Sequence, residues 1–293
     1  MRVLVTGYRG MLARDLVPCL QQAGFAAVGC GRAEFDITQE ASVCCGLEAV
    51  RPDVLINTAA YTAVDRAEAE PEVAFAVNRD GPSLLAAACR EAGIPLIHIS
   101  TDYVFNGSSR YPYREEEPAT PLGIYGQSKW AGEERIRAVQ GRYLIVRTAW
   151  LYGLYGNNFV KTMLRLARER EVLRVVDDQH GCPTWTKDLA GALAAICQRL
   201  EYKRAPSLWG TYHFCGTGQT TWRGFAQAIV DAGKTCEPLL VQRVEPIPTV
   251  DYPTAAQRPA NSVLDCSKIE AVFGLTPRPW RESLCDFMRE LYA

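Results

Sequence analysis

The sequence is poor in histidine and has no Cys-x-x-Cys pair. It contains three histidines, His98, His180 and His213, and its eleven cysteines are scattered, with Cys44 and Cys45 as the closest two. Structural zinc sites take four Cys or His ligands at short, regular spacings. We therefore expect no zinc site, and we interpret the cysteines as reduced, mostly buried small hydrophobic side chains.

The chain also lacks a charge excess and a long apolar run. Its 32 basic and 33 acidic residues give a net charge of −1, so no global field attracts nucleic acid or an anionic membrane. No apolar stretch is long enough to span a bilayer, and the first residues form the strand-like segment Arg2–Thr6 rather than an apolar leader. We expect a cytoplasmic protein without nucleic-acid or membrane partners.

What the sequence does contain is a regular alternation of apolar strands and helical patterns. Five apolar segments read as strands, namely Val3–Val5, Ala26–Cys30, Val54–Ile56, Leu96–Ser100 and Tyr143–Arg147. Continuous apolar runs are typical of parallel strands that are covered on both faces. The alternation predicts an α/β fold with a doubly wound parallel Rossmann sheet. His98, inside the fourth strand, is interpreted as a packed core histidine rather than a catalyst.

A glycine turn follows the first strand and opens a helical pattern. Gly7 and Gly10 stand in the spacing Gly-x-x-Gly-x-x-Ala, ahead of Leu12, Leu16 and Leu20. Glycines let the backbone approach a pyrophosphate, and the helix N-terminus supplies free N–H groups and the positive end of a dipole. The turn therefore predicts dinucleotide binding, with a plain strand-to-helix turn as the alternative.

The end of the second strand bears on which dinucleotide is bound. There the chain runs into Gly31 and Arg32 with no acid before the arginine, and Arg9 in the glycine turn adds a second cation. An arginine at this place accommodates a 2′-phosphate, whereas a carboxylate selects NAD. We predict NADPH, with NADH as the alternative because Glu34 is close by.

The regular alternation ends after Trp150. Loops rich in Gly, Tyr, Asn and Pro follow, interrupted by a predicted helix at 187–200 and a predicted strand at 211–214 that return to the main sheet. We predict that residues 1–149 with 187–216 form the dinucleotide-binding domain. Residues 150–186 with 217–293 are predicted to form a smaller, loop-rich C-terminal substrate domain, because polar loops facing a cofactor crevice usually carry specificity.

Tyr125 and Lys129 stand four residues apart, so a helix places them on one face. Alone, such a pair is equally compatible with a surface tyrosine packed on a lysine stem. Here it is one of six motifs that, in this order, resemble the extended short-chain dehydrogenase/reductase family. These motifs are Asn57–Asp65, Ser100–Phe105, Tyr125–Lys129, Gly156–Lys161, Asp178–Thr184 and Arg258–Ser262, and the match runs from Gly7 to Asp265.

The resemblance implies a reaction as well as a fold. It implies that NADPH reduces the 4-keto group of dTDP-4-dehydro-L-rhamnose to give dTDP-L-rhamnose; the base and the hexose rest on the resemblance alone. Hydride transfer to a ketone leaves an alkoxide that needs a proton, and a phenol with an ordinary pKa of ~10 is a poor donor near neutrality. A nearby ammonium lowers that pKa, so Lys129 is predicted to activate Tyr125 and to hold the nicotinamide ribose. Thr101 is predicted to orient the carbonyl, with Asp102 beside it.

The same resemblance implies the binding residues. For the cofactor they are Gly7, Arg9, Gly10, Met11, Leu12, Arg32, Asp36, Ile37, Ala59, Ala60 and Tyr61, together with Tyr125 and Lys129. For the sugar nucleotide they are Thr62, Val64, Thr101, Asp102, Trp150, Asn158, Lys161, Gln179 and Arg258, with Trp150 packing on the sugar.

Two alternatives stay open. Dehydratases of this family carry an acidic pair after the hydroxyl residue, whereas Tyr103 follows Asp102 here, which favours simple reduction. A related reductase or epimerase for another hexose remains an alternative, as does a non-catalytic regulatory subunit of the same fold. Some family members dimerise through magnesium bound by acidic residues. Asp15 matches one such region, but Thr186–Asp188 contains a lysine, so we predict no metal, and a monomer or homodimer.

Overall fold

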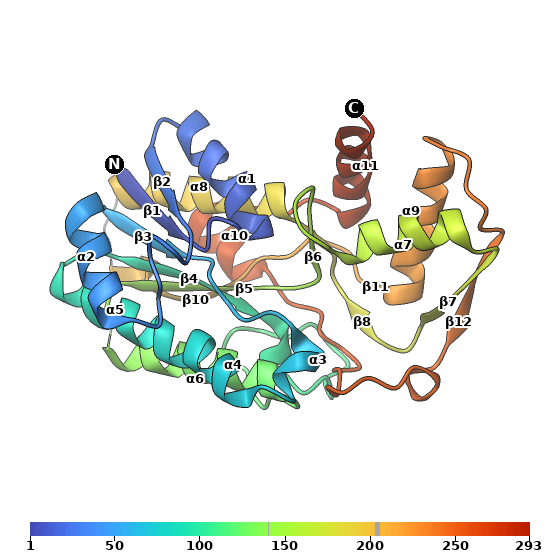
Figure 1. The fold of residues 1–293 in the computed structure, drawn as a ribbon, viewed down its shortest axis with the longest axis horizontal. Coiled ribbons are helices and arrows are strands. Elements are labelled where there is room, and N and C mark those ends of the chain that lie inside the picture. Colours follow the sequence, from blue (N-terminus) through green and yellow to red (C-terminus); the bar gives the residue numbers. More distant parts are fainter. Residues whose placement is uncertain (140, 203–205) are drawn as a thin grey trace.

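A six-stranded parallel sheet forms the centre of the computed structural model, which describes residues 1–139, 141–202 and 206–293 (Figure 1). Its strands are β1 (Arg2–Thr6), β2 (Ala26–Cys30), β3 (Val54–Asn57), β4 (Leu96–Thr101), β5 (Tyr143–Thr148) and β10 (Gly210–His213). Every pairing in this sheet is parallel. The predicted doubly wound Rossmann sheet is confirmed, including the return of the strand at 211–214.

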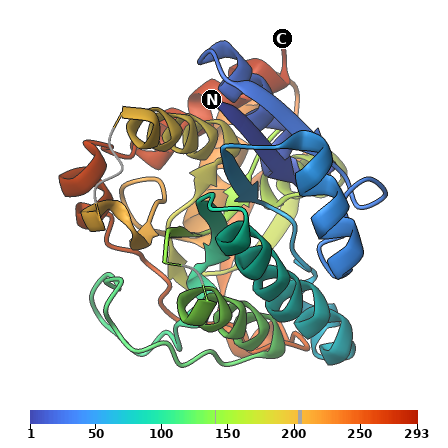
Figure 2. The same cartoon turned by 90° about the vertical axis from the view of Figure 1, so that its left-hand side faces the viewer.

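Helices cover both faces of the sheet. They are α1 (Met11–Gln22) and α8 (Thr186–Tyr202) on one face, and α2 (Glu40–Val50), α5 (Gly81–Glu91) and α6 (Ile124–Val139) on the other (Figure 2). Successive strand residues point to opposite faces, so Val3 and Val5 join one core while Leu4 joins the other. Both cores exclude water, which explains the continuous apolar runs of these strands.

The order of the strands is β10-β5-β4-β3-β1-β2. The chain therefore leaves β1 toward one edge to form β2 and then crosses back to form β3 on the other side of β1. In open α/β sheets, ligands bind outside the carboxyl ends of the strands at such a point of reversal. Here the crevice opens between the turn after β1 and the segment after β3.

A long helical stretch beside the crevice is broken by a wider turn. It consists of α4 (Pro71–Phe75), the π-helical turn η1 (Ala76–Asp80) and α5. The turn that widens is the one directly before Gly81. Asn78 of η1 hydrogen-bonds the backbone N and O of Tyr61 at 2.8 and 3.0 Å, and Ser128 Oγ of α6 at 3.0 Å. Single π turns often occur at functional sites, and this one ties the segment after β3 to α6.

The rest of the chain forms a second unit, on the right in Figure 1. Its main elements are α7 (Phe159–Glu169), β7 (Val172–Val176), α9 (Trp222–Lys234), β12 (Arg243–Ile247) and α11 (Trp280–Leu291). They enclose a hydrophobic core of their own. The description as loop-rich did not foresee α9 or α11.

Short elements connect the two units. They are α3 (Val64–Ala67), η2 (Asp102–Val104), β6 (Leu151–Tyr152), β8 (His180–Gly181), β9 (Thr184–Trp185), η3 (Pro206–Leu208), β11 (Thr220–Thr221), η4 (Thr249–Asp251) and α10 (Ser267–Phe273). Although α10 lies late in the chain, Phe273 packs edge-on against Tyr212 of β10 at 5.1 Å, and Ile269 is part of the sheet core. Residues near the C-terminus thus return to the first unit.

The cysteines differ from the prediction in burial. All eleven are free thiols, but only Cys89, Cys182, Cys197 and Cys215 are buried. Three are partly exposed and four are exposed, so the expectation that most are buried is wrong. Among the described residues, no helix combines the length and apolarity needed to cross a membrane.

Candidate active site

The turn after β1 requires a glycine at its first position. Gly7 has a φ of 70°, and a Cβ at this position would lie 2.8 Å from the Cα and N atoms of Ala59. Gly10 is the N-cap of α1 and offers no side chain to cap it, so the first-turn N–H groups stay open to a ligand. The residues thus fit a dinucleotide. Met11 begins this helix, whereas the Leu12 side chain is buried in the core and presents only its backbone.

Only some of the residues predicted to bind the adenosine half of the cofactor lie close together. Arg32 is 81% exposed, and its Nε lies 3.1 Å from Asp36 Oδ2. The Ile37 side chain is buried in the core and does not face the cofactor site. A Cβ on Gly31 would lie 2.9 Å from Glu34 Oε2, which places an acid at the end of β2 after all. The cation for a 2′-phosphate and a competing carboxylate are therefore both present here.

Four predicted catalytic residues meet at the carboxyl end of β4. Thr101 Oγ1 donates to Asp102 Oδ1 at 3.0 Å and accepts from the backbone N of Tyr103 at 3.1 Å. Tyr125 lies in the first turn of α6, close enough to Thr101 for the Thr101 hydroxyl to influence its pKa. Its ring packs edge-on against Tyr103 with centroids 5.5 Å apart. Lys129 follows one turn later on the same helix.

The electrostatics of Tyr125 differ from the prediction. Burial raises the pKa of Tyr125 above its ordinary value, and the nearby Thr101 hydroxyl opposes this rise only in part. Lys129 Nζ donates to the carbonyl of Ile99 at 2.7 Å and lies 3.2 Å from His98 Nε2. The amine is thus engaged with β4, and the expectation that it lowers the pKa of Tyr125 is corrected for this arrangement.

Lys129 is itself perturbed. Its side chain is 2% exposed, and burial lowers its pKa to about 8, against the opposing charge of Glu133. Glu133 is fully buried one turn further along α6 and binds Arg147 Nη2 of β5 at 2.7 Å and Arg137 Nη2 at 2.6 Å. The sequence analysis missed this pair, although an arginine inside an apolar strand was a usable signal.

Asp102 is the second buried acid of the site. It is 2% exposed, and its Oδ2 has no hydrogen-bond partner of good geometry among the residues that the structure describes. Burial raises the pKa of Asp102 to about 6, while contacts with Ser262 and Thr101 oppose the rise. A buried carboxyl with an open oxygen is suited to bind a hydroxyl of a sugar.

Asp102→Asn should therefore remove a pH-dependent cost of folding. The folded chain holds the Asp102 proton up to pH about 6, against an ordinary pKa of 3.8, so stability falls as pH rises through this window. We expect the variant to gain stability relative to the wild type between pH 4 and 7 by roughly 2–3 kcal/mol. Urea unfolding at both pH values measures this; an equal difference at pH 4 and pH 7 would contradict it.

Trp150 is held in a strained position after β5. Its φ is 47°, which is unusual for a bulky residue, and its ring stacks on Trp222 of α9 at 3.5 Å. Gly181 lies against the other part of the indole, where a Cβ would come within 2.3 Å of Cε2. The sequence analysis did not identify Trp222, which determines how Trp150 is presented.

Several predicted substrate residues have local partners. Asn158 Oδ1 caps α7 by accepting from Lys161 N at 3.2 Å, and its Nδ2 lies 3.7 Å from Met11 Sδ in the glycine turn. Lys161 Nζ donates to the carbonyls of Leu154 and Gly156. Asn158 thus joins the second unit to the cofactor turn, whereas Lys161 fastens its own loop.

Arg258 reaches the catalytic group from the far end of the chain. Its guanidinium donates to Tyr103 Oη at 2.9 Å and to Asp65 Oδ2 at 2.7 Å. Gln179 is 5% exposed and donates to Thr249 at 3.0 Å. The geometry thus brings Arg258 beside the Tyr125 group, while the substrate role of Gln179 stays a prediction.

The segment after β3 lines the other side of the crevice. Ala59 and Ala60 follow Asn57, and Tyr61 Oη donates to Glu70 at 2.8 Å. Thr62 is exposed, and Val64 begins α3. Ala59 approaches the glycine turn closely, and the cofactor role of Ala59, Ala60 and Tyr61 stays a prediction.

The region compared with a magnesium site contains a different arrangement. Asp15 Oδ2 accepts from Thr186 at 2.5 Å, and Lys187 Nζ lies 2.6 Å from Glu290 Oε2. In this region the Glu290 carboxylate is thus paired with a lysine ammonium. Among the described residues, no group of three or more His, Cys, Asp or Glu is placed to hold a metal ion.

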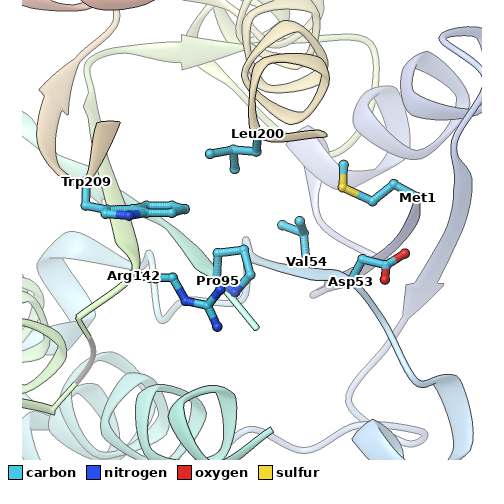
Figure 3. Close-up of a pocket in the computed structure, with 7 residues that line it drawn as sticks. All are labelled: Met1, Asp53, Val54, Pro95, Arg142, Leu200 and Trp209. Carbon is cyan, nitrogen blue, oxygen red and sulfur yellow. The ribbon is translucent and has the colours of Figure 1, made fainter. Parts of the chain in front are cut away.

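A small cavity lies at the opposite, amino edge of the sheet. Figure 3 shows it between Trp209, Arg142 and Pro95 on one side and Met1 and Asp53 on the other. These residues stand just before strands of the sheet, so the cavity is remote from Thr101 and Tyr125 at the strand ends. It therefore takes no part in the chemistry described above.

Comparison with known proteins places this arrangement in a family. A family model described as the RmlD substrate binding domain matches residues 1–293. The chain belongs to the RmlD family. A dTDP-4-dehydrorhamnose reductase from Streptomyces griseus is 46% identical over 287 residues, which cover 97% of this chain and 92% of the relative.

Solved structures resemble this RmlD-family chain over its whole length. A dTDP-4-dehydrorhamnose reductase from Clostridium acetobutylicum superposes with a TM-score of 0.92 at 36% identity, covering 100% of both chains. The Bacillus anthracis enzyme of the same name, crystallised in complex with NADP, gives 0.90 at 38% identity and covers 99% of both chains. The resemblance stated from the six motifs is confirmed.

Proposed function

We propose that the chain reduces the 4-keto group of dTDP-4-dehydro-L-rhamnose to dTDP-L-rhamnose with NADPH. One observation carries the proposal: Thr101, Asp102 and Tyr103 form a hydrogen-bonded group at the carboxyl end of β4, and the Tyr125 ring packs on Tyr103, in the sheet whose reversal point holds the Gly7 turn. The relatives named as this reductase, and the NADP complex of one of them, support the substrate and the cofactor.

In this proposal the residues act on the ketone oxygen. NADPH, when bound, supplies the hydride to C4. The Thr101 hydroxyl orients the carbonyl, and Tyr125 delivers its phenolic proton to the oxygen. Because burial raises the pKa of Tyr125, the phenol rests protonated at neutral pH, as a general acid requires. Its conjugate phenolate is then the group that a charged Lys129 would stabilise.

The two units divide the remaining tasks. We propose that residues 1–149 with 187–216 bind the cofactor, and that 150–186 with 217–293 bind the sugar nucleotide through Trp150 and Arg258. The exception is α10, which packs on β10 in the first unit. The proposal includes, as predictions from composition and resemblance, a monomer or homodimer that works in the cytoplasm without nucleic-acid or membrane partners.

A direct assay tests the reaction. Purified protein should oxidise NADPH when given dTDP-4-dehydro-L-rhamnose, with NADH slower because the exposed Arg32 side chain can meet a 2′-phosphate. Product analysis by NMR should show the L-rhamno configuration at C4. Binding of both ligands without NADPH oxidation would favour a non-catalytic subunit, and the other C4 epimer would favour a related reductase.

A further inference from the structure

The hydrogen bonds behind Lys129 begin at Asn57, at the end of β3. Its Oδ1 accepts from the backbone N of Ala59 at 3.1 Å and from Thr6 Oγ1 at 2.6 Å. A backbone N–H can only donate, so the amide orientation is determined without reference to histidine. The Nδ2 group therefore points at His98 Nδ1, 2.9 Å away.

This orientation determines the tautomer of His98. An amide Nδ2 is only a donor, so His98 Nδ1 must be the acceptor and cannot carry a hydrogen. The ring is completely buried, and burial holds the pKa of His98 well below its usual range. The neutral ring then carries its hydrogen on Nε2, the atom that lies 3.2 Å from Lys129 Nζ.

The Nε2–H group of His98 can form a hydrogen bond with Lys129 only if the lysine nitrogen offers a lone pair. An ammonium has three N–H donors and no lone pair, whereas a neutral amine has one lone pair and two N–H groups. One N–H of Lys129 is used by the carbonyl of Ile99 at 2.7 Å. We propose that Lys129 rests as a neutral amine that accepts from His98 Nε2–H, and that His98 is the positioning residue that controls its charge.

The charged and titratable groups around Lys129 come from α6, β4 and β5. On α6, Glu133 attracts a charge on Lys129, but Arg147 from β5 and Arg137 already neutralise this carboxylate. On β4 the titratable neighbour is His98. Burial, opposed by Glu133, lowers the pKa of Lys129 to about 8, and the facing Nε2–H lowers it further.

The consequence for the reaction rests on the proposed function. Gaining a proton removes the contact between Lys129 and His98, because donor then faces donor. The charge is therefore favoured only when an anion is present beside it, such as the phenolate that Tyr125 becomes after giving up its proton. Lys129 would thus be neutral at rest and charged when Tyr125 is a phenolate.

The first experiment measures the tautomer and needs no substrate. The chain has only three histidines, so ¹⁵N-histidine labelling gives few signals, and His98→Leu and His180→Gln assign them. His180 is exposed and serves as the solvent-accessible control. We expect His98 as the Nε2–H tautomer from pH 6 to 9. An Nδ1–H tautomer, or an imidazolium at pH 7, overturns the proposal.

The second experiment exchanges donors and acceptors in the hydrogen bonds that run from residue 57 through His98 to Lys129. In Asn57→Asp the carboxylate accepts from His98 Nδ1–H, so Nε2 becomes an acceptor for the Lys129 ammonium. The ¹³Cε titration midpoint of Lys129, below about 8 in the wild type, should rise by about one unit or more. In the His98→Leu background the same substitution acts only through direct charge, so most of the rise should disappear.

The two readouts separate this inference from the proposed function. An undiminished rise in the His98→Leu background, or no rise in Asn57→Asp, overturns it, and if Asn57→Asp does not fold, the wild-type tautomer alone decides. Under the proposed function, the alkaline limb of the kcat profile should follow the Lys129 midpoint. Failure of turnover with the expected tautomer would count against the reaction and not against the charge state of Lys129.

Discussion

Tyr125→Phe is expected to lower kcat for keto reduction by roughly 100- to 10,000-fold, the usual contribution of a general acid. The variant removes the phenolic proton while keeping the ring that packs on Tyr103. Thr101 keeps its bonds to Asp102 and to the backbone of Tyr103, so the frame of the site should stay intact. Stopped-flow measurement of NADPH oxidation at saturating sugar nucleotide measures the loss.

Tyr143→Phe is the matched control for this experiment. Tyr143 begins β5 at the amino edge of the sheet, opposite the site, and the change removes the same hydroxyl. It should leave kcat within about twofold of the wild type, as expected of a surface substitution away from special features. Cofactor affinity, measured by calorimetry, should stay nearly unchanged in Tyr125→Phe. A parallel loss of affinity and kcat in that variant would contradict the proton-donor role.

Arg147→Met is expected to lower the free energy of unfolding by about 3–5 kcal/mol, because it leaves a buried carboxylate with one fewer partner. Glu133 is fully buried, and Arg147 is 1% exposed. Besides the ion pair, the guanidinium lies 5.1 Å from the ring centroid of Phe105. Urea unfolding followed by circular dichroism measures the loss.

An exposed ion pair on another helix provides the comparison. Arg165 and Glu169 are more than half exposed and stand four residues apart on α7. Arg165→Met should cost no more than about 0.5 kcal/mol, since water screens such pairs. If Arg147→Met cost as little as Arg165→Met, the buried pair would not hold α6 to β5, and the position of Tyr125 would need another explanation.

Much of the fold was predictable because its strands are covered on both faces. The apolar segments from Val3 to Arg147 marked five strands, and Gly7 with Gly10 marked the turn that fits a pyrophosphate. The order of β2 and β3 around β1 was not accessible, since either side of β1 gives the same apolar pattern. The sequence between Trp222 and Lys234 was taken as loop because prolines dominate the region that follows it.

The sequence identified the residues of the site better than it identified the contacts between them. Thr101, Asp102, Tyr125 and Lys129 were identified, and the structure brings them together. The environment of Lys129 was not, because His98 stands 31 positions earlier and reads as an ordinary core residue. Arg32 was predicted as a cofactor cation with Glu34 close by, but the approach of the Glu34 carboxylate to Gly31 was not foreseen. Spacing along the chain does not reveal such crossings between elements.

The strained Trp150 has a consequence for engineering specificity. Its indole packs against the core of the second unit and against the cluster that contains Phe105 and Leu264, so one side chain joins both units. A chimera that exchanges the substrate unit between family members must therefore keep Trp150 and Trp222 from the same parent. Likewise, kinetic effects of Trp150 variants will combine a lost sugar contact with a changed angle between the units.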